Sequence, residues 1–446
     1  MPKSAVQFVC QSCGATSSKW SGRCDGCGAW NSFVETAVAV ARRGGGSTGV
    51  KLEPTKLASV DVSKTPRIKS GIDEFDQVIG GGIVPGSVML LSGDPGIGKS
   101  TLVLQLSAAI AKNKQVLYVS GEESASQIKL RAERLKLADS GVDLLTETDA
   151  DSIVATIEAG QYELVIIDSI QTLSTNNLTG AAGSVGQITA CAQTLQHVAK
   201  QRHVAVMIIG HVTKEGSIAG PKILEHLVDV VLYLEGERYG AFKALRAVKN
   251  RFGSTNEAGI FEMAEQGLVP VDNPSAALLA ERQPGAGSVV LPTLEGSRPV
   301  LIEVQALVSK SVFGYPKRTA AGFDLNRLNV LVAVLTKRAG LNLSDQDIYV
   351  NIVGGLKITE PAADLAIILS IASAFKNCSI KNDLVAYGEV GLNGEIRSVA
   401  STAKRLAEAK KLGFKRAVGP HRDADKTAAL GVKTISQAIE AALESR

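Results

Sequence analysis

The chain has 446 residues, too many for one ordinary hydrophobic core, so we expect two or three domains. Hydrophobic residues make up 45% and charged residues 21%, which excludes an intrinsically disordered chain. The net charge of +4 is too small to indicate a nucleic-acid partner by itself. No apolar run reaches the ~18 residues of a membrane span and the N-terminus lacks a signal peptide, so we expect a cytoplasmic protein with no membrane partner.

The segment 1–35 is a small module with two Cys-x-x-Cys pairs, Cys10 with Cys13 and Cys24 with Cys27. Each pair can direct two thiolates at one ion, and four thiolates form a closed tetrahedral Zn²⁺ site. Incidental cysteines are the alternative, which the matched spacing of the two pairs disfavours. No ligand position stays open, so we expect a structural role for the metal.

Residues 36–63 are predicted to be a flexible linker, because they contain three consecutive glycines and no apolar periodicity. From residue 64 to residue 272, short apolar runs alternate with segments of helical spacing. This alternation is typical of βαβ units and predicts an α/β fold with a mostly parallel sheet.

An apolar run at 87–92 leads into a segment that fits the pattern GxxxxGK[ST]. A chance glycine-rich turn is the alternative, which the strand before and the helix after disfavour. We expect backbone N–H groups to bind the phosphates of ATP, Lys99 to reach the β- and γ-phosphates, and Ser100 to ligate Mg²⁺. The predicted nucleotide-binding residues are Gly93, Asp94, Pro95, Gly96, Ile97, Gly98, Lys99, Ser100 and Thr101.

Three acidic residues follow apolar strands in this domain. Asp168 ends the run ELVIID, where a carboxylate can hold Mg²⁺, although an Asp that caps the next turn is the alternative. Glu122 and Glu123 follow the run QVLYVS, and either carboxylate can polarise the attacking water. The sequence leaves the choice between Glu122 and Glu123 open.

The run SGIDEFDQVIGGGIVPGSVMLLSGDPGIGKSTLVLQL at 70–106 resembles the opening of RecA-type ATPases, including KaiC and the DnaB helicases. With the cysteine module, the motif Lys249-Asn250-Arg251-Phe252-Gly253 and the C-terminal domain, the whole chain resembles the bacterial RadA (Sms) family. The resemblance implies a DNA-dependent ATPase of DNA repair and homologous recombination. It further implies a homo-hexameric, helicase-like ring that acts on single-stranded and branched DNA and promotes branch migration with RecA.

The resemblance also assigns roles to single residues. Glu122 matches the catalytic glutamate of the family, and His211 matches the position that senses the γ-phosphate. Residues Thr213 to Pro221 would then contact DNA. A histidine in a polar turn at a strand end is the alternative for His211.

Lys249 and Arg251 are predicted to share one face of a strand, since they are two residues apart. Two cations on one face would suit a phosphate supplied by a neighbouring subunit, and Arg251 is the better arginine finger because its planar guanidinium is always charged. A solvated basic edge and a contact to the DNA backbone are the alternatives. We therefore expect the catalytic set Lys99, Glu122, Asp168, Lys249 and Arg251.

Residues 285–446 are predicted to form a second, α+β domain that resembles the peptidase domain of the Lon protease. Ala362 stands where the resemblance places the nucleophilic serine, and the matching lysine position falls near Ala403. We therefore expect a scaffold without protease activity. A group of cations with interleaved aromatics predicts a DNA-backbone surface, with a solvated helix face as the alternative: Lys310, Phe313, Tyr315, Lys317, Arg318, Arg327, Lys337 and Arg338.

Overall fold

The computed structural model describes residues 5–10, 16–17, 19–30, 32–38, 56, 66–211, 221–236, 241–312, 314–424 and 429–444. It divides into two compact units: Met1–Leu234 with Ala247–Thr255 and Glu265–Leu268, and Glu235–Arg246 with Asn256–Ala264 and Val269–Arg446. The two units exchange short segments of the chain between residues 234 and 269, so their boundaries differ from the predicted ones at 272 and 285. Within the described ranges, no helix has the length and apolar character to cross a membrane.

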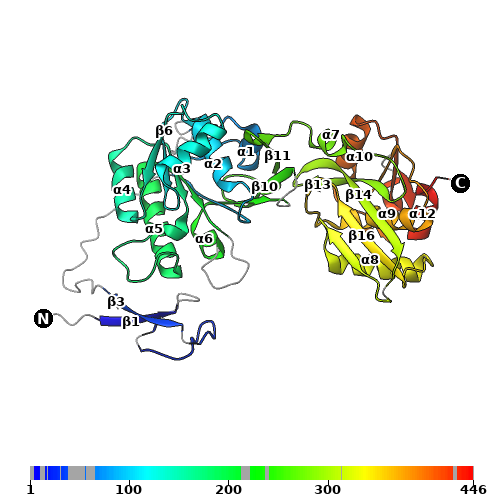
Figure 1. Ribbon diagram of the computed structural model, residues 1–446, viewed down its shortest axis with the longest axis horizontal. Coiled ribbons are helices and arrows are strands. Elements are labelled where there is room, and N and C mark those ends of the chain that lie inside the picture. Colours follow the sequence, from blue (N-terminus) through cyan, green and yellow to red (C-terminus); the bar gives the residue numbers. More distant parts are fainter. Residues whose placement is uncertain are drawn as a thin grey trace. The chain divides into compact units, whose positions relative to one another are not determined.

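The N-terminal module is a three-stranded antiparallel sheet in the order β2-β1-β3 (Figure 1). Its strands are β1 (Ala5–Cys10), β2 (Thr16–Ser17) and β3 (Phe33–Val38). Strand β3 pairs with β1 along its whole length, from Phe33 opposite Cys10 to Val38 opposite Ala5. The module therefore extends three residues beyond the predicted end at residue 35. Most of the predicted linker lies outside the described residues.

The nine-stranded sheet has the order β12-β11-β10-β9-β4-β8-β7-β5-β6, of which the six strands from β9 to β6 are parallel. The parallel strands are β4 (Val88–Gly93), β5 (Val116–Ser120), β6 (Val142–Thr146), β7 (Leu164–Asp168), β8 (Ala205–Ile209) and β9 (Val230–Glu235). Strands β10 (Phe242–Asn250), β11 (Ala258–Ala264) and β12 (Gly267–Pro270) follow. The predicted α/β fold is confirmed.

Helices cover both faces of this sheet (Figure 1). They are α1 (Asp73–Val78), α2 (Lys99–Ile110), α3 (Ala125–Arg134), α4 (Ala150–Ala159), α5 (Val185–Arg202) and α6 (Pro221–Leu227). Alternate strand residues such as Leu90, Val119 and Ile167 pack with α4 and α5 in one core cluster. The intervening strand residues face the opposite side, which carries α2. Strands buried on both faces explain the continuous apolar runs of the sequence.

The C-terminal unit has a mixed seven-stranded sheet in the order β15-β16-β14-β13-β17-β20-β21. Its strands are β13 (Ser288–Glu295), β14 (Arg298–Lys310), β15 (Arg318–Ala321), β16 (Gln346–Ile352), β17 (Leu384–Ala386), β20 (Arg416–Pro420) and β21 (Leu430–Val432). Its helices are α7 (Pro274–Leu279), α8 (Leu325–Arg338), α9 (Asp364–Lys376), α10 (Thr402–Lys411), α11 (His421–Ala424) and α12 (Ile435–Ala442). Helix α9 is buried almost throughout and packs on β13 and β14. A short hairpin, β18 (Glu389–Val390) with β19 (Ile396–Arg397), encloses a turn at Asn393-Gly394.

Candidate active site

Strand β4 runs directly into the predicted phosphate loop, and helix α2 begins at Lys99. Gly93 has a φ of +148°, and a Cβ atom there would lie 2.4 Å from the carbonyl oxygen of Leu234, so glycine is required. Gly98 precedes α2 with a φ of +114°, and no side chain of the described residues caps the helix. The first N–H groups of α2 are therefore available to an anion, as in phosphate-binding helix termini.

The ammonium group of Lys99 is buried inside this loop. Its Nζ donates hydrogen bonds to the carbonyl oxygens of Gly93, at 2.8 Å, and Asp94, at 3.0 Å. Burial lowers the pKa of Lys99, and the negative charges of Asp168, Asp94 and Glu122 oppose this shift. The predicted phosphate-binding lysine thus stands among three acids at one edge of the sheet.

Asp168 is the last residue of β7, on the same edge, and its side chain is buried. Its Oδ2 accepts a hydrogen bond of 2.5 Å from the phenol of Tyr118 on β5. The structure therefore brings the predicted metal carboxylate next to the phosphate loop. The hydroxyl of Ser100, in the first turn of α2, and the Asp168 carboxylate form an all-oxygen donor set that fits Mg²⁺ on nucleotide phosphates. A bound Mg²⁺ would neutralise phosphate charge here.

The two glutamates after β5 have different surroundings. Glu122 accepts a short hydrogen bond from the hydroxyl of Ser169, and its Oε1 lies 3.4 Å from Nε2 of His211. Glu123 instead forms an ion pair of 2.7 Å with Arg131 on α3. Glu122 therefore faces the edge where β7 and β8 end, whereas Glu123 is occupied in a pair on the helix side.

His211 is brought to this site from the end of β8. Its carbonyl oxygen accepts a hydrogen bond of 3.4 Å from Nε2 of Gln171, which follows β7. The imidazole contacts Glu122, and the segment 212–220 that follows lies outside the described residues. The predicted DNA-contacting loop, Thr213 to Pro221, falls almost wholly on that segment.

The expectation that Lys249 and Arg251 share a strand face is wrong, because β10 ends at Asn250 and Arg251 lies in the turn beyond it. Nζ of Lys249 donates hydrogen bonds to the carbonyl oxygens of Glu225, at 2.6 Å, and Val228, at 2.8 Å. Both acceptors belong to the C-terminal end of α6, so the Lys249 ammonium stabilises that helix end.

Arg251 lies at the opposite edge of the sheet from its own phosphate loop. Its Nη1 is 3.1 Å from Oδ1 of Asp229, whose Oδ2 accepts a hydrogen bond of 3.1 Å from the backbone N–H of Val88. Val88 begins β4 and Gly93 ends it, so the whole strand, about 17 Å at ~3.3 Å per residue, separates Arg251 from the loop. The guanidinium remains half exposed.

In the N-terminal module, the Sγ atoms of Cys10, Cys24 and Cys27 all lie within 4.8 Å of one another. Cys10 and Cys27 are 3.7 Å apart at sulfur, and Gly28 closes the second knuckle with a hydrogen bond of its N–H to the carbonyl of Cys24. Cys13, the predicted fourth ligand, lies outside the described residues. Three converging thiols, one at the end of β1 and two in the loop between β2 and β3, fit a Zn²⁺ ion.

The two positions that match a protease dyad carry no reactive group. Ala362 is buried in a 3-10 turn before α9, and Ala403 is exposed on α10. Next to Ala362, Glu360 forms a 2.6 Å ion pair with the fully buried Arg405. Burial raises the pKa of Glu360, but the contacts with Arg405 and Thr293 outweigh it, so this pKa lies below its ordinary value.

The predicted basic surface is only partly available. Lys310, Lys317, Lys337 and Arg338 are exposed, whereas Arg318 is half-buried. Arg327 is taken up by the buried carboxylate of Asp364, to which its Nε donates a hydrogen bond of 3.0 Å. Tyr315 is 86% exposed in the same segment as Lys310 and Lys317, and Phe313 lies outside the described residues.

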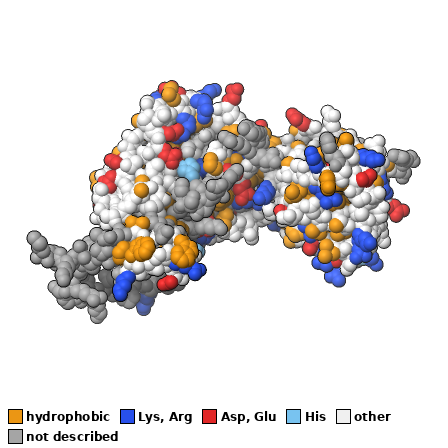
Figure 2. Space-filling view, turned by 60° about the horizontal axis from the view of Figure 1, so that its bottom comes forward, with side chains coloured by type: hydrophobic (Ala, Val, Ile, Leu, Met, Phe, Trp, Pro, Cys, Tyr) orange, Lys and Arg blue, Asp and Glu red, His pale blue; other side chains and the backbone are white. Residues whose placement is uncertain are grey.

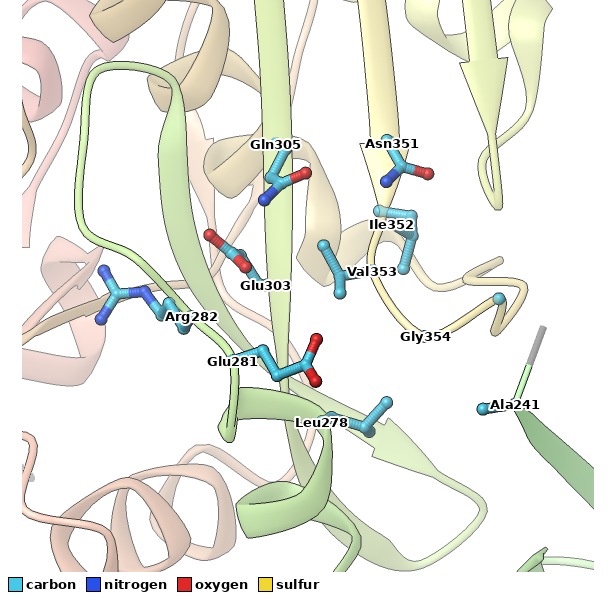
Figure 3. A pocket seen from close by; sticks show the side chains of 11 residues that line it. Ala241, Leu278, Glu281, Arg282, Glu303, Gln305, Asn351, Ile352, Val353 and Gly354 are labelled. Carbon is cyan, nitrogen blue, oxygen red and sulfur yellow. The ribbon is translucent and has the colours of Figure 1, made fainter. Parts of the chain in front are cut away.

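The C-terminal unit also contains a cavity of about 460 Å³. Figure 3 shows Glu281 after α7, Glu303 and Gln305 on β14, and Asn351 on β16 around this space. The described residues that line it include two carboxylates and no hydroxyl or thiol side chain.

Three residues of the site were not predicted from the sequence: Tyr118, Ser169 and Gln171. They donate hydrogen bonds to Asp168, to Glu122 and to the backbone carbonyl of His211, respectively. A tyrosine in an otherwise aliphatic strand was a usable signal for the first, because a buried phenol needs a hydrogen-bond partner. The other two had no comparable signal.

A phosphate loop after β4, in the parallel part of the sheet, and an acid at the end of β7, two strands away, define a P-loop ATPase of the RecA type. Residues 52–217 match the family described as "AAA domain", residues 8–35 match "Rubredoxin metal binding domain", and residues 314–423 match "Subunit ChlI of Mg-chelatase". Among solved structures, the chain is similar to the "RadB recombinase", with 22% identity and a TM-score of 0.36, over 46% of this chain and 100% of that chain.

Full-length relatives give the family. The "DNA repair protein RadA" of Bacillus subtilis (strain 168) is 48% identical over 99% of this chain and 100% of its own length. The protein of the same name from Pseudomonas aeruginosa is 48% identical over the whole of both chains. The chain belongs to the RadA family, and the predicted combination of zinc module, RecA-type ATPase and Lon-like domain is confirmed.

Proposed function

We propose that the chain is a DNA-stimulated ATPase of DNA repair and homologous recombination. ATP hydrolysis is supported above all by the surroundings of Glu122. The Ser169 hydroxyl and the His211 imidazole contact its carboxylate, at the edge of the sheet where Lys99 and Asp168 also lie. Glu122 polarises the attacking water, and Lys99 stabilises the charge of the phosphoryl group. Ser100 and Asp168 would hold a Mg²⁺, which would supply further positive charge there.

The DNA part rests on the family and on charge. Relatives along the whole chain bear the name "DNA repair protein RadA". Exposed Lys310, Lys317, Lys337 and Arg338 provide cations for a phosphate backbone, and Figure 2 shows groups of Lys and Arg side chains on the visible face of the C-terminal unit. We propose single-stranded and branched DNA as substrates and His211 as the link between the nucleotide and the segment that follows it.

The ring is a further part of the proposal. Arg251 lies a whole strand away from its own phosphate loop, so it cannot complete its own nucleotide site. A half-exposed guanidinium at that edge suits the nucleotide of a neighbouring subunit in a homo-hexamer. Lys249 supports the helix end beside it.

The C-terminal domain acts in this proposal as a scaffold. Ala362 and Ala403 replace a nucleophile and its base, and the buried Glu360–Arg405 pair joins the turn before α9 to α10. The pair holds these two elements of the domain together. We therefore propose that the domain is proteolytically inactive and organises the ring and the DNA.

A strand-exchange assay with purified RecA and ATP tests the proposed function. Wild-type protein should accelerate heteroduplex growth by promoting branch migration, and Lys99→Ala should not. Lys112→Ala, an exposed lysine directly beyond α2, is the matched control and should behave as wild type. Normal ATP hydrolysis without any acceleration would contradict the DNA function and favour a nucleotide-driven protein switch of the KaiC kind.

A further inference from the structure

Tyr118 places a phenol in the centre of an otherwise aliphatic strand, β5. Its side chain is fully buried, and its hydroxyl donates the 2.5 Å hydrogen bond to Oδ2 of Asp168. Ser120 lies opposite Asp168 in the parallel ladder, so Tyr118, two residues earlier, shares its face of the sheet. The phenol thus approaches the Asp168 carboxylate from within the sheet, on the side away from the edge where the phosphate loop lies.

A second contact fixes the direction of this hydrogen bond. Nη2 of Arg131 on α3 lies 3.4 Å from the phenol oxygen, and a guanidinium can only donate. The phenol oxygen therefore accepts from Arg131, and its own hydrogen is directed to Asp168.

Glu123 completes the arrangement, because its Oε2 holds Arg131 at 2.7 Å. The chain of contacts runs from Glu123 through Arg131 and Tyr118 to Asp168. Among the described residues, only Tyr118 donates a hydrogen bond to the Asp168 carboxylate, and it uses one oxygen. The other oxygen, Oδ1, is left for a ligand.

We propose that Tyr118 is a positioning residue for the metal: it fixes Asp168 through Oδ2 so that Oδ1 is presented to the Mg²⁺ of the bound nucleotide. This inference rests on the proposed ATPase function. A structural role alone would satisfy a buried carboxylate but would leave the metal dependence of nucleotide binding unchanged. The two roles therefore differ in a property that can be measured.

The variant is Tyr118→Phe, which removes only the hydroxyl. Tyr162→Phe is the matched control, because the Tyr162 phenol also bonds a carboxylate, that of Asp143, on a different part of the same domain. For each protein, the affinity for a fluorescent ATP analogue is measured across a Mg²⁺ titration and in excess EDTA. The Mg²⁺ concentration for half-maximal hydrolysis is measured in parallel.

Tyr118→Phe should need about tenfold or more Mg²⁺ for half-maximal binding, the effect expected for a lost hydrogen bond to a charged group. Its affinity in EDTA and the behaviour of Tyr162→Phe should match wild type. Arg131→Ala should shift the Mg²⁺ requirement in the same direction by a smaller factor, and it serves as the test if Tyr118→Phe does not fold.

An unchanged Mg²⁺ requirement in these variants would overturn the inference, as would an equal loss of affinity in EDTA. A wild-type protein that binds nucleotide with Mg²⁺ but does not hydrolyse it would instead contradict the proposed function. In that case the binding titration still decides the role of Tyr118.

Discussion

Two adjacent glutamates, Glu122 and Glu123, show how side-chain surroundings separate roles that the sequence leaves equivalent. Ser169 and His211 contact Glu122, whereas Arg131 pairs with Glu123. A carboxylate that polarises water contributes about 10²–10⁴ to a rate. The surroundings of Glu122 favour this role, and those of Glu123 favour support of α3.

We predict that Glu122→Gln lowers ATP turnover at saturating Mg²⁺ by about 10²-fold or more while nucleotide binding is retained. At saturating Mg²⁺, Glu123→Gln should lose far less, because it weakens the ion pair with Arg131, at the far end of the contacts that lead to Asp168, and leaves the Glu122 carboxylate in place. Steady-state hydrolysis and nucleotide binding of the two variants, measured side by side, check this. Equal losses of turnover in both variants would contradict the assignment.

The sequence predicted the residues that belong to a local motif but not their supports. Lys99 and Ser100 follow from one continuous pattern with a strand before it and a helix after it. Tyr118 meets Asp168 fifty positions away along the chain, and Ser169 meets Glu122 at a separation of 47. Those contacts depend on the pairing of β5 with β7, which no local pattern specifies.

At the scale of elements, we expect the N-terminal sheet to gain much of its stability from metal, because its core is very small. Its buried cluster contains only Cys10, Cys24 and Phe33 among the described residues. We predict one Zn²⁺ per chain in the wild type and its loss in Cys24→Ser, by elemental analysis. Cys378→Ser, which changes an isolated thiol of the C-terminal unit, is the control. Full zinc occupancy in Cys24→Ser would refute the site.

The ion pair between Glu360 and the buried Arg405 is predicted to stabilise the C-terminal domain. Arg405→Ala should lower its free energy of unfolding by about 2–3 kcal/mol, because Glu360 keeps its hydrogen bonds from Thr293 and Leu294 but loses its charged partner. The neighbouring Lys404→Ala, on the exposed side of α10, should change it by about 0.5 kcal/mol or less. Guanidinium denaturation measures both.

The ion pair between Glu360 and Arg405 also makes the stability of the C-terminal domain depend on pH. The pKa of Glu360 is lowered in the folded protein. The stability that the ionised Glu360 contributes is therefore fully present above the ordinary pKa of 4.5 and is lost as the pH falls through the lowered pKa. The difference between wild type and Arg405→Ala should therefore shrink on acidification below pH 4.5. A difference that stays constant there would show that the lost packing, not the charge, is responsible.

Element boundaries followed the sequence well where periodicity or turn residues mark them, and poorly where pairing decides them. The Asn393-Gly394 turn and the long helices α5, α8 and α9 were predictable from local patterns. The end of β10 at Asn250 was not, because residues 249–251 are all polar and the first glycine comes only at Gly253. Because β10 ends there, Arg251 does not share a strand face with Lys249.

At the scale of the whole molecule, the proposal requires each nucleotide site to be completed by a second chain. We predict that Arg251→Ala and Lys99→Ala each lose hydrolysis, a missing finger alone costing ~10³-fold or more. Mixed rings should recover part of the activity, because some interfaces join an intact phosphate loop to an intact Arg251. Failure to recover activity in rings shown to contain both variants would count against the role in trans.

The central claim is that this P-loop ATPase works on DNA, and ATP hydrolysis measured with and without single-stranded DNA tests it most directly. We predict that hydrolysis by the wild-type protein rises with added single-stranded DNA and that the stimulation weakens as salt is increased, since cations on the protein neutralise phosphates. Lys99→Ala should hydrolyse no ATP under either condition. Wild-type hydrolysis that is robust yet unaffected by single-stranded or branched DNA at any salt concentration would contradict the account.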